Sequence, residues 1–343
     1  MLKPMMVALA AALLASPIGA AFAEDKSVVL IGNQRFGDLG PMDDMARGLA
    51  RCESEHGVTV KKLESISPGR FEEDIRAMAQ EGYDLVMTTF PPMTEPTVTV
   101  AEDYPDVNFL AIYQFANAGD DKFGNVWSTE FRGHEANYVL GALAGRMSTS
   151  KKTGYIAGTE EPSINGDING FIQGVAETCA ECSVEFAFAG SWEDPAAGKE
   201  IATAMISRGV DYIQTEAAAT QIGAIEAAKE GGILIAGDNG DNFELHKQGF
   251  VTWVAASFAN NVALGCELLV AGKLPNGQHT HMTLANGGVI VPWEPIARFA
   301  QENPDRAAQT EAAVAFARDV EAKIVGGEIA VVYNPDTPKA LSR

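Results

Sequence analysis

The sequence predicts an α/β fold of two doubly wound parallel-sheet lobes that are joined by a hinge. Short apolar runs alternate with amphipathic segments of helical length, a pattern typical of parallel sheets covered by helices. The alternation starts again near Asn125, so the same architecture is expected twice within 343 residues. Connections between successive parallel strands are almost always right-handed.

The first unit begins with an apolar strand at residues 27–32, followed by the Gly-rich loop 33–40. An amphipathic helix is expected over about 42–56, because its apolar residues recur at helical spacing. Later strands are expected at 58–63, 84–90 and 107–113, and helices at 71–80 and from Thr97. The strand at 84–90 ends in the turn Pro91-Pro92.

The second unit begins with an extended segment at 125–131 and a helix at 135–147, whose small residues suit close packing. Strands are then expected at 153–157, 184–188, 212–214 and from Ile233, with part of a helix at 170–177, a helix at 198–207 and an Ala-rich segment at 220–230. A strand near 250–255 and a helix at 257–271 follow. Residues 272–287 are rich in Gly, Asn, Thr and His and are expected to break regular structure.

The two lobes are expected to be discontinuous in sequence. The N-terminal lobe would hold residues 24–131 plus about 245–280, and the C-terminal lobe 132–244 plus part of 281–343. The sequence leaves open which lobe receives the tail, in which a helix at 307–325 and a strand at 329–333 are expected. Two such lobes place both sets of strand ends on one cleft, the shape of a trap that closes around a small molecule.

The first 23 residues have the features of a cleaved secretory signal peptide. Lys3 precedes an apolar run from Met6 to Leu14, and Ala21-Phe22-Ala23 forms a small-x-small cleavage site. The apolar run is shorter than the roughly 20 residues that a membrane-spanning helix needs. No Cys lies at the cleavage site, so no lipid anchor is expected, and the protein is predicted to be periplasmic.

The mature chain is strongly acidic. Cleavage removes Lys3 and leaves 24 basic against 46 acidic residues, a formal charge of −22. Such a surface repels phosphate backbones and anionic lipid, which argues against nucleic acid or a membrane surface as partner. The carboxylates are scattered along the chain, which favours a solvated exterior over a dedicated cation site.

Four cysteines would lie in an oxidising compartment, where disulfides form. Cys179-Ala180-Glu181-Cys182 favours a short structural disulfide at a helix end, because no second pair of metal ligands has matching spacing. Cys52 and Cys266 fall on predicted helices, and the sequence does not decide whether they pair. His279-Thr280-His281 is interpreted as loop surface, and neither a metal site nor a cofactor is predicted.

An aromatic ring and several carboxylates follow predicted strand ends between residues 190 and 241. Trp192 lies in a loop, and Glu216 and Asp238 close successive apolar runs. Ligands bind at this edge of a parallel sheet. The sequence contains no dinucleotide fingerprint, no phosphate-cradling GxxxxGK[ST] and no GxSxG elbow, so no catalytic residue is predicted.

Three groups of motifs occur in order along the chain. They are Asn125-Val126-Trp127-Ser128 with Glu135 and Gly141, Gly190-Ser191-Trp192-Glu193-Asp194-Pro195 with Gly198-Lys199-Glu200, and Ile225-Glu226-Ala227-Ala228-Lys229-Glu230 followed by Gly237-Asp238-Asn239-Gly240-Asp241. Over about residues 27–292 they resemble the basic membrane protein family, the PnrA-like substrate-binding proteins of ABC transporters. The resemblance implies two type I periplasmic-binding lobes, a purine nucleoside between them and an ABC permease in the inner membrane as partner.

The resemblance also implies ligand-binding residues. Trp192 stands where the family has a Phe that stacks on the nucleobase, and its indole offers a larger π surface. Asp238 matches an Asp that would accept hydrogen bonds from ribose hydroxyls. Asp38 matches an acidic residue of the first loop.

The chain departs from the family pattern at three places. The first-loop Phe is missing, so Phe36 or Phe90 would have to supply the second ring. A family Lys is missing near Asn260, and the usual Arg pair is replaced by Asn165-Gly166, with Asp167 following. The loss of cations and the gain of amides and carboxylates shift the predicted pocket toward donor-rich or cationic ligands.

Structural alternatives exist for these residues. Trp192 could cap the core beneath its loop, Asp38, Asp167 and Asp238 could be helix N-caps, and Asn165 could be a loop former.

We therefore expect a monomeric periplasmic binding protein of an ABC importer that closes over a small polar aromatic ligand, with a purine nucleoside as first choice. The alternatives are a sensor for another small solute and a hydrolase with paired carboxylates such as Asp238 and Asp241.

Overall fold

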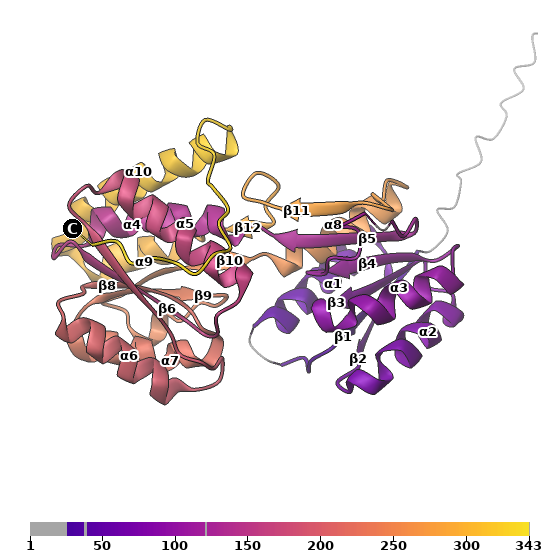
Figure 1. Ribbon diagram of the computed structural model, residues 1–343. Coiled ribbons are helices and arrows are strands. Elements are labelled where there is room, and N and C mark those ends of the chain that lie inside the picture. The colour runs from indigo at the N-terminus through magenta and orange to yellow at the C-terminus, as the bar shows by residue number, and fades with distance from the viewer. Residues whose placement is uncertain (1–25, 38–39, 121, 343) are drawn as a thin grey trace, which may run out of the picture.

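The computed structural model describes residues 26–342 apart from residues 38, 39 and 121 (Figure 1). The expected signal peptide and Asp38 lie outside the described residues. The chain forms two α/β lobes, as predicted (Figure 1). None of the helices in the described part of the chain is both long enough and apolar enough to cross a bilayer.

The first lobe is built on a six-stranded parallel sheet with the strand order β11-β5-β4-β3-β1-β2. The strands are β1 Ser27–Gly32, β2 Thr59–Glu64, β3 Leu85–Thr89, β4 Asn108–Ile112, β5 Val126–Phe131 and β11 His279–Met282. The helices are α1 Pro41–His56, α2 Phe71–Glu81, α3 Thr94–Asp103 and α8 Phe258–Val270.

Strand β1 shows why helices cover both faces of this sheet. Val28 and Leu30 pack in the core with α1 and α8, whereas Val29 and Ile31 pack in a separate core with α2 and α3. All four side chains are fully buried. A strand that is buried on both faces has apolar residues at successive positions. The uninterrupted apolar runs in the sequence are therefore strands of a two-sided sheet.

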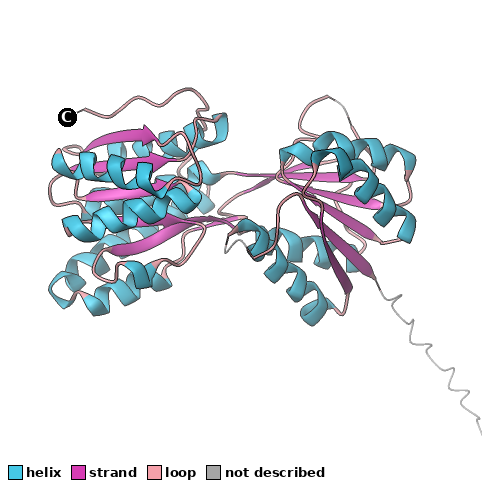
Figure 2. Ribbon diagram, turned by 90° about the horizontal axis from the view of Figure 1, so that it is seen from below, coloured by secondary structure: helices cyan, strands magenta, loops and turns pink. Residues whose placement is uncertain are grey.

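The second lobe is built on a six-stranded sheet with the order β12-β10-β9-β8-β6-β7, in which only β12 is antiparallel among the described pairings. The strands are β6 Lys152–Ala157, β7 Ser183–Phe188, β8 Tyr212–Glu216, β9 Leu234–Asp238, β10 Phe250–Ala256 and β12 Val289–Ile290. The helices are α4 Gly133–Met147, α5 Pro162–Thr178, α6 Pro195–Ser207, α7 Gln221–Gly231, α9 Glu294–Glu302 and α10 Ala307–Val325. Figure 2 shows helices on both faces of each sheet.

The two lobes repeat one topology and exchange a helix. The strand order β2-β1-β3-β4-β5 of the first sheet corresponds to β7-β6-β8-β9-β10 of the second. Helix α4 follows β5 but packs on α5 of the second lobe, and α8 follows β10 but packs on α1 of the first lobe. The chain therefore crosses between the lobes at Arg132, at Ser257 and over residues 283–288.

Three elements differ from the sequence-based expectations. Strand β10 pairs with β9, so the chain returns to the first lobe at Ser257 rather than near residue 245. Residues 272–287 contain a parallel strand, β11, beside β5. Helix α5 spans Pro162–Thr178 and so extends beyond 170–177, the part of a helix that was expected.

The C-terminal segment joins the second lobe. Helix α10 packs on α4, and α9 packs on β10. The expected strand at 329–333 is absent from the described chain, because this segment lies along α5 and bonds to side chains instead of to a sheet. Asn169 Nδ2 donates to the carbonyl oxygens of Asn334 and Asp336, at 2.9 Å each.

Both cysteine pairs form disulfides. The Cys179–Cys182 bridge at the end of α5 confirms the expected short structural disulfide. The Cys52–Cys266 bridge joins α1 to α8 across 214 residues of sequence. This second bridge fixes the exchanged helix to the first lobe.

Candidate functional site

Four non-glycine residues that follow strand ends have positive backbone φ angles. Phe90 (64°) follows β3, Tyr113 (54°) follows β4, and Asn239 (47°) follows β9. Ala218 (45°) lies two residues after β8. Such conformations cost about 1–3 kcal/mol each and gather at functional sites. The carboxyl ends of both sheets are therefore the candidate ligand site.

The first lobe places an aromatic cluster at this edge. The ring centroids of Phe90 and Tyr113 lie 6.2 Å apart, edge to face. Phe131, at the end of β5, lies 5.8 Å from Tyr113 and 4.7 Å from Phe258 of α8. Phe258 is buried and the other three rings are half-buried. The cluster offers a large apolar surface with one phenol group.

The second lobe places three carboxyl groups at the corresponding edge. Asp167 of α5 is hydrogen-bonded to Glu216 at the end of β8, and Asp238 ends β9. Burial and the neighbouring Glu216 carboxylate raise the pKa of Asp167 and of Asp238 well above the usual range, and burial also raises the pKa of Glu216. Two carboxyl groups this close share a proton rather than both ionise.

Tyr155 of β6 supports the carboxyl pair from inside the lobe. Its hydroxyl donates to Glu216 Oε2 at 2.6 Å and lies 3.1 Å from Asn137 Oδ1 of α4. Burial raises the pKa of Tyr155 well above its usual value, so the phenol stays protonated and remains a donor. The carboxyl group nevertheless keeps unused acceptor capacity, which suits a ligand with N–H, O–H or positively charged groups.

Gln221, the first residue of α7, fixes the main chain at Asp238. The Asp238 N–H donates to Gln221 Oε1, and Gln221 Nε2 donates to the Asp238 carbonyl oxygen, at 2.9 Å each. Asn239 Nδ2 donates to Asp238 Oδ1, while the Ala218 N–H lies 3.5 Å from Oδ2. Asp238 Oδ2 therefore has the weaker internal partner and can accept from a ligand.

Trp192 lies over the end of β6, the strand that pairs with β8 up to Glu216. Its indole covers Gly158, the residue after β6, so closely that a Cβ on Gly158 would lie 2.4 Å from the ring. The Gly158 N–H donates in turn to the Glu216 carbonyl oxygen at 3.0 Å. Trp192 packs against the core of the second lobe but is only half-buried, so part of its ring faces solvent.

Tyr113 connects the two edges. Burial raises its pKa, the second-lobe carboxylates Asp167 and Glu216 raise it further, and a hydrogen bond with Ser163 of α5 lowers it. A phenol of the first lobe thus lies in hydrogen-bonding and electrostatic reach of the second. The aromatic edge and the carboxyl edge face each other across the line between the lobes.

Two of the sequence-predicted residues lie away from the carboxyl pair. Phe36 follows β1, where its N–H donates to Glu64 Oε1 at 3.0 Å and Lys62 Nζ lies 4.8 Å over its ring. Asn260 Oδ1 accepts from Arg51 Nη1 at 2.9 Å, and Asn260 Nδ2 donates to the Gly287 carbonyl oxygen at 3.0 Å. Asn260 therefore joins α8 to α1 and to the third crossing segment.

Asn165 is directed toward the C-terminal segment. Its Nδ2 donates to the Pro335 carbonyl oxygen at 3.1 Å, and its buried Oδ1 has no hydrogen-bond partner among the described atoms. Asn165 and Asp167 lie inside α5, and Asp238 ends a strand. The loop interpretation of Asn165 and the N-cap interpretation of Asp167 and Asp238 are therefore wrong.

Sequence reasoning missed three residues of this region. Tyr113 had a detectable signal, because it ends an apolar run just as Phe90 does. Tyr155 lies within an apolar run, and Gln221 follows an Ala-rich stretch, so neither carried a pattern that indicates a site.

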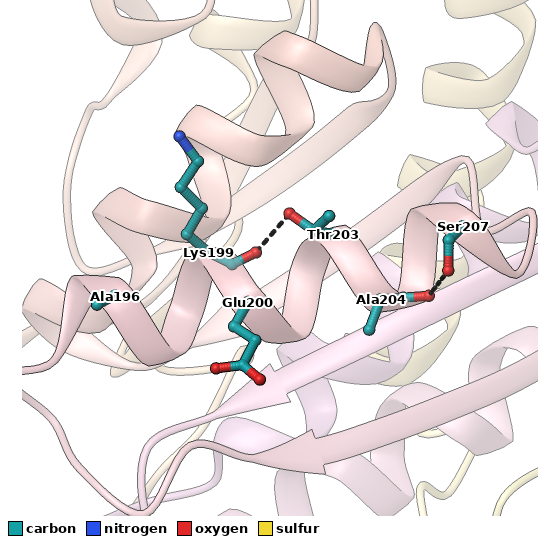
Figure 3. Close-up of a pocket in the computed structure, with 6 residues that line it drawn as sticks. All are labelled: Ala196, Lys199, Glu200, Thr203, Ala204 and Ser207. Carbon is teal, nitrogen blue, oxygen red and sulfur yellow. Dashed lines mark hydrogen bonds between the residues drawn. The ribbon is translucent and has the colours of Figure 1, made fainter.

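Two surface hollows lie outside this region. Figure 3 shows one along α6, lined by Ala196, Lys199, Glu200, Thr203, Ala204 and Ser207. The Lys199 ammonium bonds to Glu230 Oε1 at 2.8 Å, and all the lining side chains come from this one helix. The other hollow lies near Asn108, Asn125 and Asn276, at the amino ends of β4, β5 and β11. Neither hollow contains a predicted site residue.

Two lobes of equal topology, with facing carboxyl edges and crossing segments between them, define a two-lobed solute-binding protein. The comparison with protein families agrees with this class. The family model described as ABC transporter substrate-binding protein PnrA-like matches residues 25–334. The chain therefore belongs to this family of ABC transporter substrate-binding proteins, which confirms the resemblance seen in the sequence.

Individual relatives agree with the family. The "Purine-binding protein BAB2_0673" of Brucella abortus (strain 2308) is 31% identical over 65% of this chain and 63% of its own length. The "ABC transporter nucleoside-binding protein BmpA" of Lactococcus lactis subsp. cremoris (strain MG1363) is 28% identical over 49% of this chain and 46% of its own length. The chain thus matches less than two thirds of either relative.

A solved structure shows the same fold. It is the ABC transporter solute-binding protein from Aeropyrum pernix K1, which superposes with a TM-score of 0.74 at 24% identity. The superposition covers 91% of this chain and 94% of that chain. The fold class predicted from the sequence is therefore confirmed.

Proposed function

We propose that this protein is the periplasmic binding component of an ABC importer and that its two lobes close over a purine nucleoside. One observation carries the proposal: the aromatic edge of the first lobe faces the carboxyl edge of the second, with Tyr113 in reach of both. A flat apolar ring that bears N–H and hydroxyl donors is the kind of ligand that matches both edges. The purine-binding and nucleoside-binding names of two relatives support this choice.

Each edge has its own part in this proposal. Trp192 and Phe90 stack on the base, since base–aromatic stacking contributes about 1–3 kcal/mol per ring. Asp238 accepts from ribose hydroxyls through Oδ2, and the Asp167–Glu216 pair accepts from N–H groups of the base.

The remaining predicted residues act at the margins of the site. Phe36, in the segment after β1, would meet the ligand from the first lobe, and Asp38 stays a predicted contact from the family resemblance. Asn165 and Asn260 hold the C-terminal segment and the third crossing segment in place, as their hydrogen bonds indicate.

The test is a thermal-shift panel on ligand-free protein with purine nucleosides, pyrimidine nucleosides, free bases, amines and sugars. A ligand that binds only the folded state raises the melting temperature. We expect the largest rise with a purine nucleoside. We expect Trp192→Ala to weaken its binding by about 1–3 kcal/mol and Trp192→Phe to retain most of it. A panel without a nucleoside response, or equal affinity of Trp192→Ala and wild type, would refute the proposal.

A cationic solute is the second candidate. The carboxyl groups of Asp167, Glu216 and Asp238 favour it, because a bound cation would offset the burial that raises their pKa values. The amine arm of the panel separates the two candidates. A polyamine that raises the melting temperature more than every nucleoside would favour the cationic ligand, and chemical turnover of a stabilising compound would favour a hydrolase.

Location and transport partner belong to the same proposal. The signal-peptide features of residues 1–23 support export to the periplasm, and family membership supports delivery to a membrane permease. Deleting residues 2–23 should retain the protein in the cytoplasm, which cell fractionation would detect.

A further inference from the structure

Strand β11 runs beside β5 in the first lobe (Figure 1). Three side chains on these two strands could together hold a metal ion. The strand register places His279 beside Ser128 and His281 beside Glu130. Residues two apart on a strand share one face of the sheet. One ligand atom from each of Glu130, His279 and His281 lies within 4.8 Å of the others.

The separations within the cluster fit a small divalent ion. Glu130 Oε2 lies 3.5 Å from His279 Nε2, and Glu130 Oε1 lies 3.3 Å from His281 Nε2. Ligand atoms about 2.0–2.1 Å from a tetrahedral zinc ion are about 3.4 Å from one another. The carboxylate and each imidazole therefore already have the spacing that one shared ion requires.

His279 is oriented as a metal ligand. Its side chain is only 8% exposed, and its Nδ1 lies 2.8 Å from Ser128 Oγ. Its Nε2 is buried without a hydrogen-bond partner among the described atoms and is directed at Glu130. A hydrogen bond on the far ring nitrogen is the usual support of a metal-binding histidine, because it fixes the tautomer and the ring.

Arg132 is the competing cation. Its Nη2 lies 2.8 Å from Glu130 Oε1 and 2.6 Å from His281 Nε2. The same guanidinium lies 5.2 Å over the Tyr333 ring. Because an aromatic face also stabilises a cation, Arg132 can leave Glu130 without losing every partner.

We propose that Glu130, His279 and His281 form a site for a borderline divalent metal such as Zn²⁺, and that Arg132 occupies its place when no metal is bound. Imidazole ligands favour Zn²⁺, Ni²⁺ or Cu²⁺ over Mg²⁺ and Ca²⁺. Three protein ligands leave the fourth tetrahedral position to water. The ion would clamp β11 to β5 beside the first crossing, where the Arg132 N–H donates to the Met282 carbonyl oxygen at 2.8 Å.

The test is calorimetric titration of untagged, chelator-treated protein with ZnCl₂. We expect one ion per chain, and we expect Co²⁺ in its place to show the visible absorption bands of tetrahedral coordination. His281→Asn should weaken Zn²⁺ binding by at least about tenfold, the smallest loss typical even for a supporting residue. The His281 side chain is 49% exposed, so this variant is expected to fold, and circular dichroism checks that it does.

Two further variants test the role of Arg132 and the specificity of the site. Arg132→Gln should tighten Zn²⁺ binding, because it removes the competing charge. His56→Asn, at the end of α1, should leave binding unchanged and serves as the matched control. Failure to bind one Zn²⁺ per chain, or equal affinities of wild type and His281→Asn, would overturn the proposal.

Discussion

Gln221 and Asp238 are joined by a cyclic pair of hydrogen bonds between a side-chain amide and a main chain. Gln221 begins α7 and Asp238 ends β9, so the pair ties the start of a helix to the end of the neighbouring strand. Both residues are buried. The position of the Asp238 carboxylate is thus set by a residue that needs no ligand contact of its own.

Replacing Gln221 should therefore affect both stability and binding. We expect Gln221→Ala to lower the free energy of unfolding by about 1–3 kcal/mol, because it leaves buried main-chain groups of Asp238 unpaired. Gln221→Glu keeps an acceptor for the Asp238 N–H but sets a second acceptor against the Asp238 carbonyl oxygen, so it should lose stability as well. Denaturant unfolding measures the stability of both variants. Equal stability of Gln221→Ala and wild type would contradict this role of the Gln221 side chain.

Because of the Asp167–Glu216 pair, the free energy of unfolding of the ligand-free protein should fall as pH rises. A carboxyl group whose pKa is raised in the folded state binds more protons there than in the unfolded state. Its contribution to the free energy of unfolding is fully present below the unfolded-state pKa of about 3.9. This contribution is lost as pH rises toward the folded-state pKa, by about 1.4 kcal/mol per pH unit. Asp167→Asn should thus match wild type near pH 4 and exceed it at pH 7.5.

Asp211 provides a control of opposite sign. Burial raises its pKa, but hydrogen bonds from Ser148, Thr149 and Ser150 lower it more, and the net pKa lies below its usual value. Its stabilising contribution is present above the unfolded pKa and is lost as pH falls through the folded pKa. Asp211→Asn should therefore be less stable than wild type at pH 7.5. The same pH profile for Asp167→Asn and Asp211→Asn in denaturant unfolding would refute both assignments.

Removing the long-range disulfide should lower the free energy of unfolding more than removing the short one. The Cys52–Cys266 bridge spans 214 residues of sequence, whereas Cys179–Cys182 spans 3. In the loop-entropy model, a longer closed loop restricts the unfolded chain more. We expect the double Cys→Ala variant of the long bridge to lose about 2–5 kcal/mol, and that of the short bridge to lose less. The reverse order in denaturant unfolding would contradict this account.

Close packing of α4 on α5 should make Gly174 sensitive to substitution. A Cβ on Gly174 would lie 2.1 Å from the Tyr138 carbonyl oxygen. We expect Gly174→Ala to destabilise by about 1–3 kcal/mol, since overpacking outweighs the better helix propensity of alanine. A Cβ on Gly69 would meet no described atom within 4 Å outside its immediate chain neighbours, so Gly69→Ala is the matched control. Equal melting temperatures of the two variants would count against the close contact.

The alternation of strands and helices was predictable because the central strands, such as β1, β3 and β4, are buried on both faces and so appear as apolar runs. Strand β11 was not, because it is short, lies at the edge of its sheet and carries His279 and His281 in place of an apolar face. The strand expected at 329–333 does not form, for the opposite reason. Its residues have strand propensity, but the carbonyl of Val332 accepts from Gln173 on a helix, at 2.8 Å.

The site was predictable only in part. Glu216 and Asp238 follow from their positions at strand ends, and Asp167 was proposed from the family motif. The contact between Asp167 and Glu216 depends on where α5 begins, and the sequence pattern predicted only 170–177 of that helix, which starts at Pro162. Tertiary contacts of this kind have no local signal, so Tyr155 and Gln221 could be found only in three dimensions.

The exchange of helices has a consequence for biosynthesis. Residues 133–256, which form five of the six strands and most of the helices of the second lobe, are translated before α8 and β11 of the first. Until Phe258–Val270 emerges from the ribosome, α1 lacks its packing partner and Cys52 lacks Cys266. The first lobe is therefore completed only after most of the second has been made, and an incomplete chain exposes the apolar side of α1 to chaperones and proteases.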